Sequence, residues 1–215
     1  MPLTASEIVR QMSAGRIVID PFCDAQLNPN SYNVRIGDEL GVYIPADTPG
    51  VEPMVKECFA LDLPLPATRL DCRKDNPLIY LTMLEKGALL HPGKLYLGAT
   101  VERTETPYHV PVIDGRSSLA RLGVKVHVTG GFGDIGFKGN WTLEIEVTEP
   151  VRIYPFMQFA QIGFHEPVGS IDKTYDGKYQ GHTRPTPSRI HKEIPDDSGI
   201  KHCAADHGDP EDDPG

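Results

Sequence analysis

The sequence predicts a mainly β fold, a barrel or a sandwich built from short strands. Several segments alternate apolar and polar residues with a period of two, as half-buried strands do. The 21 glycines and 20 prolines are scattered rather than repeated, which is typical of many strands joined by turns. Because 39% of the 215 residues are hydrophobic, we expect a globular domain with a core of its own.

The chain is expected to open with a short helix and a strand. Residues 4–7, Thr-Ala-Ser-Glu, have the pattern of a capping box, in which side chains satisfy the first backbone N–H groups of a helix. Apolar residues follow at helical spacing as far as Met12, and Gly15 is placed to end the helix. Residues 16–22 (RIVIDPF) are β-branched and predict the first strand.

The next part of the chain is less regular. Residues 32–36 alternate and predict a strand, which Gly37 and Asp38 would end in a turn. Residues 46–77 are rich in proline and charge, so we expect a long excursion or insert there with at most one strand. A strand returns at residues 78–84.

Three later segments alternate most clearly. A tight turn at His91-Pro92-Gly93 precedes residues 95–102, in which every second residue is apolar. Residues 124–129 and 141–148 have the same alternation. Strands at this spacing, with turns between them, indicate a barrel or a sandwich.

We expect one domain over residues 1–193. The apolar period is lost from Gly169 onward, and residues 175–190 are basic and carry glycine and proline. Residues 170–193 could therefore form a flexible lid. Residues 194–215 are acidic with almost no apolar side chains and predict a disordered tail.

The composition excludes several classes of function. A formal net charge of -9 favours neither a nucleic-acid backbone nor an anionic membrane as partner. No apolar stretch approaches the length of a membrane span and the first residues lack a signal-peptide core, so a cytoplasmic location is expected. The four cysteines form no CxxC pair and are interpreted as reduced thiols: Cys23, Cys58, Cys72 and Cys203.

Residues 115–123 (GRSSLARLG) gather two arginines and two serines at a turn. Arginine forks match phosphate oxygens, and serine hydroxyls add hydrogen-bond donors. Composition alone favours a simpler interpretation, a polar turn that starts a short helix with Leu119 and Leu122 buried.

A glycine-rich stretch follows at residues 129–139 (TGGFGDIGFKG). Glycine lets the main chain approach a planar ligand closely, and Asp134 lies at the turn. The commoner arrangement is a β-hairpin in which the aspartate caps its own backbone.

Two further groups could take part in chemistry. Glu144 lies on the polar face of the strand at 141–148, but Glu146 shares that face and the spacing does not separate them. A solvated strand face is the simpler interpretation. The C-terminal run, which could be a basic lid over phosphates or a solvated tail, holds Tyr175, Lys178, Tyr179, Arg184 and Arg189.

Zinc is not expected. Zinc-dependent base deaminases carry H-x-E together with P-C-x-x-C. His191-Lys192-Glu193 matches the first pattern, but P-C-x-x-C is absent from the sequence and Cys203 stands alone. The P-loop and dinucleotide fingerprints are absent too.

Taken together, these motifs resemble the dCTP deaminase branch of the dUTPase superfamily over about residues 4–192. They occur in the family's order. The strongest matches are residues 115–123, His127-Val128-Thr129, residues 134–139 (DIGFKG), Leu143-Glu144 and residues 178–189 (KYQGHTRPTPSR), with weaker support from residues 30–37 and 91–93.

The resemblance implies a fold and a reaction. The fold would be a distorted dUTPase-like β-barrel (β-clip) with a short N-terminal helix, assembled as a homotrimer with active sites between subunits. Glu144 would take a proton from the water that attacks cytosine C4, pass one to N3 and protonate the departing amine. Ser117 and Arg121 would position the water, and Asp134 would bind the sugar hydroxyl.

The resemblance also implies nucleotide contacts. Arg116, Ser118 and Lys178 would hold phosphates, with Mg²⁺ bridging the triphosphate and no metal bound by the protein alone. The remaining nucleotide-binding residues would be Leu119, Ala120, Thr129, Gly130, Thr142, Leu143, Gln161, Tyr175 and His182. The partners implied are dCTP and dUTP, with dTTP as a candidate inhibitor.

The product is either dUTP or dUMP. Monofunctional members carry Ala-His-Arg after the hairpin threonine, whereas dUMP-forming members carry Ala-Gly and an aromatic residue. Gly130-Gly131-Phe132 and Gln161 are nearer the second group, as are residues 178–189. We therefore expect dUMP and diphosphate as products.

Several residues depart from the family's pattern. Glycines replace an alanine at Gly130 and an isoleucine at Gly133; His182, Arg184 and Asn33 replace a glutamine, a glycine and an aspartate. The alternatives are a monofunctional deaminase that gives dUTP, a plain dUTPase, a deaminase for a 5-substituted deoxycytidine nucleotide (because of Gly130), and a nucleotide-sensing protein without turnover.

Overall fold

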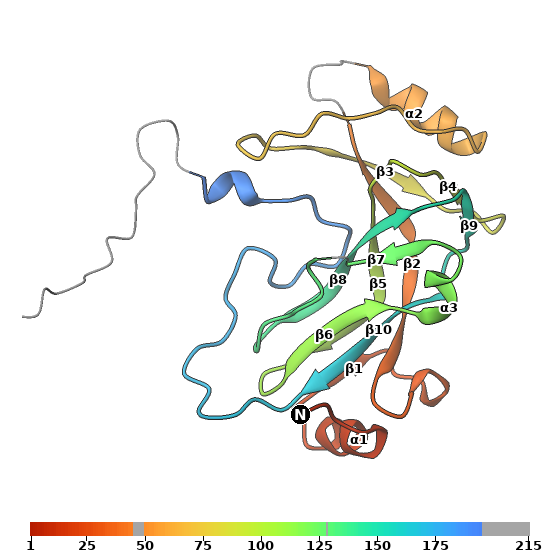
Figure 1. Ribbon diagram of the computed structural model, residues 1–215. Helices are drawn as coiled ribbons and strands as arrows, with labels where there is room; N and C mark the ends of the chain where they lie inside the picture. The colour runs from red at the N-terminus through yellow and green to blue at the C-terminus, as the bar shows by residue number, and fades with distance from the viewer. Residues whose placement is uncertain (45–49, 128, 195–215) are drawn as a thin grey trace, which may run out of the picture.

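The computed structural model describes residues 1–44, 50–127 and 129–194. In these residues the chain forms a mainly β barrel, as predicted (Figure 1). The strands are β1 (Val18–Asp20), β2 (Tyr32–Tyr43), β3 (Leu78–Thr82), β4 (Ala88–Leu90), β5 (Tyr96–Glu105), β6 (Val110–Gly115), β7 (Val124–Val126), β8 (Lys138–Val147), β9 (Val151–Ile153) and β10 (Gln158–His165). The helices are α1 (Ala5–Ser13), α2 (Val51–Ala60) and α3 (Ser117–Ala120), with 3-10 turns η1 (Asp24–Gln26) and η2 (Ile190–Lys192).

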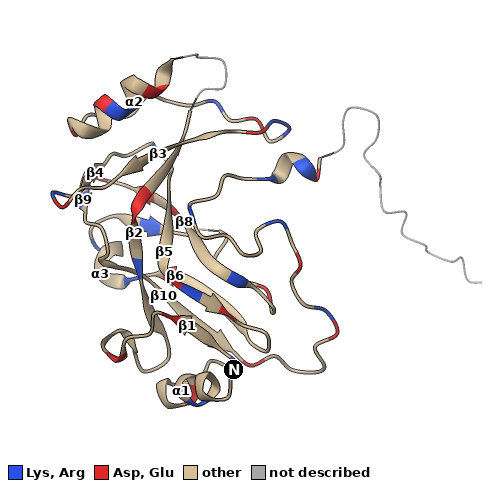
Figure 2. Ribbon diagram, turned by 180° about the vertical axis from the view of Figure 1, so that it is seen from behind, with Lys and Arg blue, Asp and Glu red and all other residues tan. Residues whose placement is uncertain are grey.

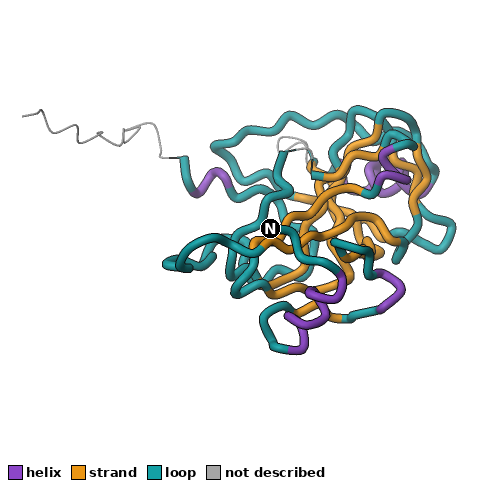
Figure 3. Tube along the Cα trace, turned by 60° about the horizontal axis from the view of Figure 1, so that its bottom comes forward, coloured by secondary structure: helices purple, strands orange, loops and turns teal. Residues whose placement is uncertain are grey.

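Eight strands make one sheet that curves almost into a closed barrel. Its main path is β6-β10-β2-β5-β8-β7, with β1 paired to β5 and β3 paired to β2, and β4 and β9 form a separate pair. The strands occupy the centre of the molecule and the helices lie at its edge (Figure 3). The two end strands approach each other through the glycine-rich segment, since the Ile113 amide donates to the Gly131 carbonyl at 2.8 Å and the Gly133 amide donates to the Pro111 carbonyl at 2.9 Å.

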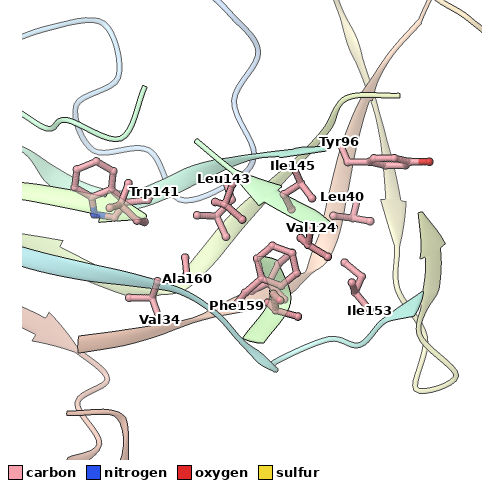
Figure 4. Close-up of a cluster of buried hydrophobic side chains, with 14 of the residues drawn as sticks. Val34, Leu40, Tyr96, Val124, Trp141, Leu143, Ile145, Ile153, Phe159 and Ala160 are labelled. Carbon is pink, nitrogen blue, oxygen red and sulfur yellow. The ribbon is translucent and has the colours of Figure 1, made fainter. Parts of the chain in front are cut away.

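The core lies inside this barrel. The alternation predicted for residues 141–148 is confirmed, because Trp141, Leu143, Ile145 and Val147 are buried and the polar residues between them are not. Figure 4 shows Leu143 and Ile145 of β8 facing Phe159 and Ala160 of β10 across the interior. The strand predicted at residues 124–129 ends earlier, at Val126, and Val128 lies outside the described residues.

The predicted N-terminal helix is confirmed, but the prediction of a capping box at its start is wrong. Thr4 is the N-cap, yet its side chain makes no capping hydrogen bond. The Glu7 carboxylate instead accepts hydrogen bonds from Arg10 Nε (2.8 Å) and Gln11 Nε2 (2.6 Å). The Arg10 and Gln11 bonds lower the pKa of Glu7 to about 2. The first strand is shorter than predicted and spans Val18–Asp20 only.

The turn predicted at Gly37 and Asp38 is also wrong. β2 continues through them to Tyr43, and its pairing with β5 shifts register between Ile36 and Leu40. A bulge of this kind bends a strand without ending it. The bend lets β2 pair with β10 at one end and with β3 at the other.

The excursion at residues 46–77 contains a helix rather than a strand in its described part. α2 buries Val51 and Val55. Lys94 ties the chain after α2 to the end of β2, because its Nζ donates to the Tyr43 carbonyl (3.1 Å), the Pro66 carbonyl (3.0 Å) and Thr68 Oγ1 (2.7 Å). Burial lowers the pKa of Lys94. Residues 45–49 lie outside the described part.

β5 differs from the half-buried strand that was expected. Its polar positions are buried too, because other strands pair along both of its edges and residues pack on both of its faces. Glu102 is fully buried, and its carboxylate accepts hydrogen bonds from Gln26 Nε2 (2.9 Å), the Arg35 amide (2.7 Å) and Arg35 Nε (2.7 Å). A buried carboxylate needs such partners to offset its lost hydration.

The cysteine prediction can be compared with the structure for three of the four residues. Cys23, Cys58 and Cys72 are free thiols, and Cys203 lies outside the described residues. The predicted tail also lies outside them from residue 195 onward. Among the described residues no helix is both long and apolar enough to cross a bilayer.

A buried histidine makes stability depend on pH. His109 is 4% exposed, and burial lowers the pKa of its imidazole from 6.5, against a hydrogen bond to the Arg16 backbone that raises it. The unfolded chain then binds a proton at pH values where the folded chain does not, so stability is lost as pH falls through about 6.5. We expect the Tm to drop between about pH 7 and pH 5, and to drop less in His109→Gln. Equal drops in the two proteins would assign the dependence to other groups.

Candidate active site

The described residues surround a cavity of about 820 Å³. It lies between β8, residues 130–134 and residues 175–193, which we term the C-terminal segment. Figure 1 shows this segment, in blue, beside β8. The cavity brings together seven residues that the sequence analysis assigned to the site: Gly130, Asp134, Thr142, Glu144, Tyr175, Lys178 and His182.

Glu144 reaches the cavity because of its place in β8. It pairs with Leu97 of β5, and its side chain is on the face opposite the buried Leu143 and Ile145. The side chain is 46% exposed. Glu146, which the sequence could not distinguish from Glu144, is not among the cavity-lining residues. The structure therefore separates the two carboxylates.

The glycine-rich segment forms one wall, and it is not a simple hairpin. It bridges to β6 through Phe132 and Val112 and so helps to close the barrel. Gly133 is buried, and a Cβ there would collide with the Trp141 ring and meet Pro111 Cγ at 2.9 Å. The indole of Trp141 thus occupies the space that a larger residue at 133 would need. Its Nε1 donates to Thr104 Oγ1 at 2.9 Å.

Aromatic rings form a second wall. The Phe137 ring lies 4.8 Å from the Trp141 ring and 6.1 Å from the Tyr175 ring, measured between centroids. Tyr43 of β2 also lines the cavity, and burial raises the pKa of its phenol. Ring faces and glycine main chain suit a flat ligand.

The C-terminal segment is fixed to the barrel by main-chain hydrogen bonds. The Gly181 amide donates to the Lys138 carbonyl and the Asn140 amide donates to the His182 carbonyl, both at 2.8 Å. The Ser188 amide donates to the Tyr43 hydroxyl at 2.9 Å. Each bond places part of the segment over the cavity.

Arg184 adds a side-chain anchor to the same segment. Its Nε and Nη2 donate to the Glu39 carboxylate at 2.8 and 2.7 Å, and its guanidinium lies 4.1 Å from the centre of the Tyr80 ring. The hydrogen bond with Glu39 raises the pKa of Arg184.

The charges in the cavity have both signs. Lys178, Lys192 and His182 contribute the basic side chains, and Asp134, Glu144 and Glu193 the acidic ones. Lys178 Nζ pairs with the Glu193 carboxylate, and this hydrogen bond raises the pKa of Lys178. Figure 2 shows the Lys and Arg of the segment in blue and its Asp and Glu in red; in the sequence, four Lys and Arg residues stand between Asp176 and Glu193.

The other predicted site residues do not line the cavity. In Figure 1 α3 lies on the right of the barrel and the C-terminal segment on the left. Ser117, Ser118, Ala120 and Arg121 are exposed there, Leu119 is buried, and Leu122 is 58% exposed, although the simpler interpretation of this turn had it buried. Arg116 Nη1 donates to the Gln158 carbonyl at 3.0 Å.

Three further predicted residues have other surroundings. Leu143 is fully buried in the core, so it can offer a ligand only its main chain. Gln161 Nε2 donates to the Gly115 carbonyl at 3.2 Å, which supports the strand that leads to α3. Thr129 is exposed in the turn beside Gly130.

Several residues of the site were not among those predicted to form it. Tyr43, Phe137 and Trp141 line the cavity, as do Thr186 and Ser188 of the C-terminal segment. Phe137, inside the glycine-rich stretch, and Trp141, just after it, were a usable signal. Tyr43 had none, because it comes from a strand that is distant in the sequence.

Comparison with known proteins agrees with the architecture. The structure resembles a crystal structure of 2'-deoxycytidine 5'-triphosphate deaminase from Agrobacterium tumefaciens, with a TM-score of 0.52 and 20% sequence identity. The match covers 77% of this chain and 48% of that longer chain. At 20% identity this similarity shows the fold alone: the two proteins share the same class of β-barrel.

The sequence comparisons are more specific. A sequence model of the dCTP deaminase-like family matches residues 2–167. Proteins named "dCTP deaminase, dUMP-forming" from Hathewaya histolytica and Leptospira biflexa are 45% and 44% identical to this chain over 194 residues. The alignments cover 90% of this chain and 99% and 98% of those proteins. The chain therefore belongs to the dCTP deaminase-like family.

Proposed function

We propose that the protein hydrolyses dCTP to dUMP, ammonia and diphosphate without zinc. The observation that carries this proposal is Glu144, a carboxylate that lines a cavity together with aromatic rings, glycine main chain and the side chains of Lys178 and Lys192. The names of the relatives, "dCTP deaminase, dUMP-forming", support the same reaction. We further propose that it acts in the cytoplasm.

Glu144 would move the protons of the deamination. It takes a proton from water as the oxygen attacks C4, and passes that proton to N3. It then takes the proton of the new C4 hydroxyl and delivers it to the amine, which leaves as ammonia while the C4 carbonyl forms. A single carboxylate can serve as base and then as acid, because each step returns the proton that it used.

A second copy of the chain would complete the site. α3 carries Ser117, Ser118 and Arg121 on its exposed surface, but it does not line the cavity of its own subunit. In a homotrimer, α3 of one subunit can reach the cavity of the next. Ser117 and Arg121 would then orient the water, and Arg116 and Ser118 would bind phosphates.

Magnesium fits this site as the counter-ion of the triphosphate. Within the described ranges, no group of three or more His, Cys, Asp or Glu side chains could hold a metal ion. Lys178 and Lys192 suit phosphate oxygens. We infer that Mg²⁺ enters on the substrate, where it would neutralise charge on the leaving diphosphate.

The remaining proposed roles are binding of the sugar, binding of the base and closure of a lid over the nucleotide. Asp134 would bind the sugar hydroxyl, and main-chain groups near Gly130 and Thr142 would bind the base edge. Residues 170–193 would act as a lid, with Tyr175, Lys178 and His182 over the nucleotide. Phe132 and Gln161, which the dUMP-forming pattern shares, support cleavage of the triphosphate. dTTP would bind as a competing product-like nucleotide.

One observation favours a wider choice of base. A Cβ on Gly130 would lie 3.3 Å from Glu144 Oε2, so glycine leaves open space beside the carboxylate that serves C4. C5 is the carbon next to C4. A 5-substituted deoxycytidine triphosphate is therefore the second candidate substrate.

The test offers dCTP, 5-methyl-dCTP and dUTP in parallel and measures release of ammonia and of diphosphate. The proposal expects release from dCTP, and faster release from 5-methyl-dCTP would favour the second candidate. Binding of either nucleotide without ammonia would favour a sensing protein. Cleavage of dUTP alone would favour a dUTPase.

The ion pair of Lys178 and Glu193 leads to a prediction about affinity. A phosphate that binds the Lys178 ammonium has to compete with the Glu193 carboxylate for it. We expect Glu193→Gln to lower the KM for dCTP about two- to five-fold at low salt, the size of an exposed ion pair, with kcat unchanged. Salt should shrink the difference. An unchanged or higher KM at low salt would contradict this role.

A further inference from the structure

His127 directly follows β7 and lies opposite Glu144 of β8. The register pairs Lys125 with Glu146 and Val126 with Ile145, so the position after the end of β7 faces Glu144. The His127 amide donates to the Glu144 carbonyl at 3.1 Å. Cross-strand neighbours have side chains on the same face of the sheet. The imidazole therefore belongs to the surroundings of the Glu144 carboxylate.

The imidazole is buried without a complete set of partners. Its side chain is 5% exposed, and neither ring nitrogen makes a hydrogen bond with any described residue. Nδ1 lies 3.4 Å from Glu144 Oε2. A buried N–H group without an acceptor destabilises the fold. Of the two neutral tautomers, the one protonated on Nδ1 places its proton toward a carboxylate oxygen.

The backbone at this position is also unusual. His127 has a φ of +50°, in the left-handed region that few residues other than glycine adopt, although asparagine, aspartate and histidine do so more often than the rest. Such strain recurs at functional sites, where the surrounding structure holds it in place. It occurs here at the residue that follows β7, just before the glycine-rich segment.

Gly130 gives these two side chains room to meet. A Cβ there would lie 3.3 Å from Glu144 Oε2 and 3.8 Å from His127 Nδ1. The absence of that carbon lets the carboxylate and the ring close the remaining gap. Catalytic hydrogen bonds are often long in an empty site and tighten when substrate binds.

We propose that His127 is a positioning residue for Glu144. Its Nδ1–H donates to Glu144 Oε2 when the site is occupied, which fixes the carboxylate rotamer and leaves Oε1 for the attacking water. This role rests on the proposed function of Glu144. It predicts that His127 serves deamination rather than binding or triphosphate cleavage.

Two substitutions distinguish the effect of the hydrogen bond from the effect of the backbone conformation. Both His127→Asn and His127→Gly tolerate a positive φ, but only asparagine keeps an N–H donor near the position of Nδ1. We expect His127→Gly to lower kcat for ammonia release about ten- to hundred-fold, the usual cost of a misplaced catalytic group, with little change in KM. His127→Asn should recover most of that loss. Equal losses in the two variants, or a loss carried by KM, would overturn the proposal.

Cleavage of dUTP supplies a second comparison in the same proteins. We expect diphosphate release from dUTP to stay near the parent rate in His127→Gly, because that reaction does not use the water held by Glu144. A parallel fall of both activities would indicate a structural role for the ring and would overturn the proposal.

The tautomer gives a readout that does not depend on turnover. ¹⁵N NMR of histidine-labelled protein, with His127→Asn to assign the signal, should show the His127 ring protonated on Nδ1 when dCTP is bound to Glu144→Gln, whose amide oxygen can accept the bond. A ring protonated on Nε2 would contradict the proposal. If the parent protein releases no ammonia yet the Nδ1 tautomer is found, the proposed function fails while the contact stands.

Discussion

Glu144→Gln should abolish release of ammonia from dCTP, with a loss of about a thousand-fold or more in kcat. The substitution keeps the size of the side chain but removes the group that takes a proton from water and delivers one to the amine. The KM for dCTP should change little, because the amide still fills the same wall of the cavity. A coupled assay for ammonia measures both constants.

The matched control is Glu146→Gln. Glu146 lies two residues further along β8, on the same face, and does not line the cavity. Its substitution changes the net charge and the strand in the same way. Ammonia release should stay near the parent rate. A comparable loss in both variants would show that the polar face of β8, rather than Glu144, is what matters.

Mixing two inactive variants should restore activity if neighbouring subunits share each site. Arg121→Ala and Glu144→Gln are each expected to be inactive. When the two chains are refolded together in equal amounts, about a quarter of the sites should combine an intact Glu144 with an intact Arg121 from the neighbour. Ammonia release should return to about that fraction of the parent rate.

The control for this experiment refolds each variant by itself, which should give no activity. Recovery in the mixture would also fix the minimum assembly as an oligomer. A mixture that stays inactive, from chains that do assemble, would place Glu144 and Arg121 in the site of one subunit. The proposed position of α3 in the cavity of a second copy would then be wrong.

The alternation of apolar and polar residues predicted a strand correctly where one face of that strand packs against the core and the other is exposed. β8 alternates cleanly, and its predicted burial is confirmed. β6 and β10 were missed, although Ile162 and Phe164 of β10 alternate with polar or small residues. β5 was mistaken for a half-buried strand because burial of its second face depends on residues that pack on it from distant parts of the chain.

Turn residues misled the prediction in another way. Gly37 and Asp38 have the composition of a turn, but hydrogen bonds to β5 and β3 carry the strand past them. The helix α2 lies in a stretch whose prolines and charges indicated irregular structure. In both places tertiary contacts outweighed local preference.

The candidate site was also predicted in part from the sequence, and the remaining residues depended on tertiary structure. Family motifs pointed to Glu144, Asp134 and Lys178, and all three line the cavity. Spacing alone could not choose between Glu144 and Glu146, because both lie on the same face of β8. His127 was known only as part of a motif, since its contact with Glu144 depends on the register of β7 and β8.

The most direct measurement incubates the purified protein with dCTP and magnesium and separates the nucleotides by ion-exchange chromatography. The account predicts dUMP and diphosphate without accumulation of dUTP. Accumulating dUTP would contradict the dUMP-forming assignment that Phe132 and Gln161 support. dCTP that remains intact, while Glu144→Gln behaves like the parent, would contradict the central claim that Glu144 deaminates this nucleotide.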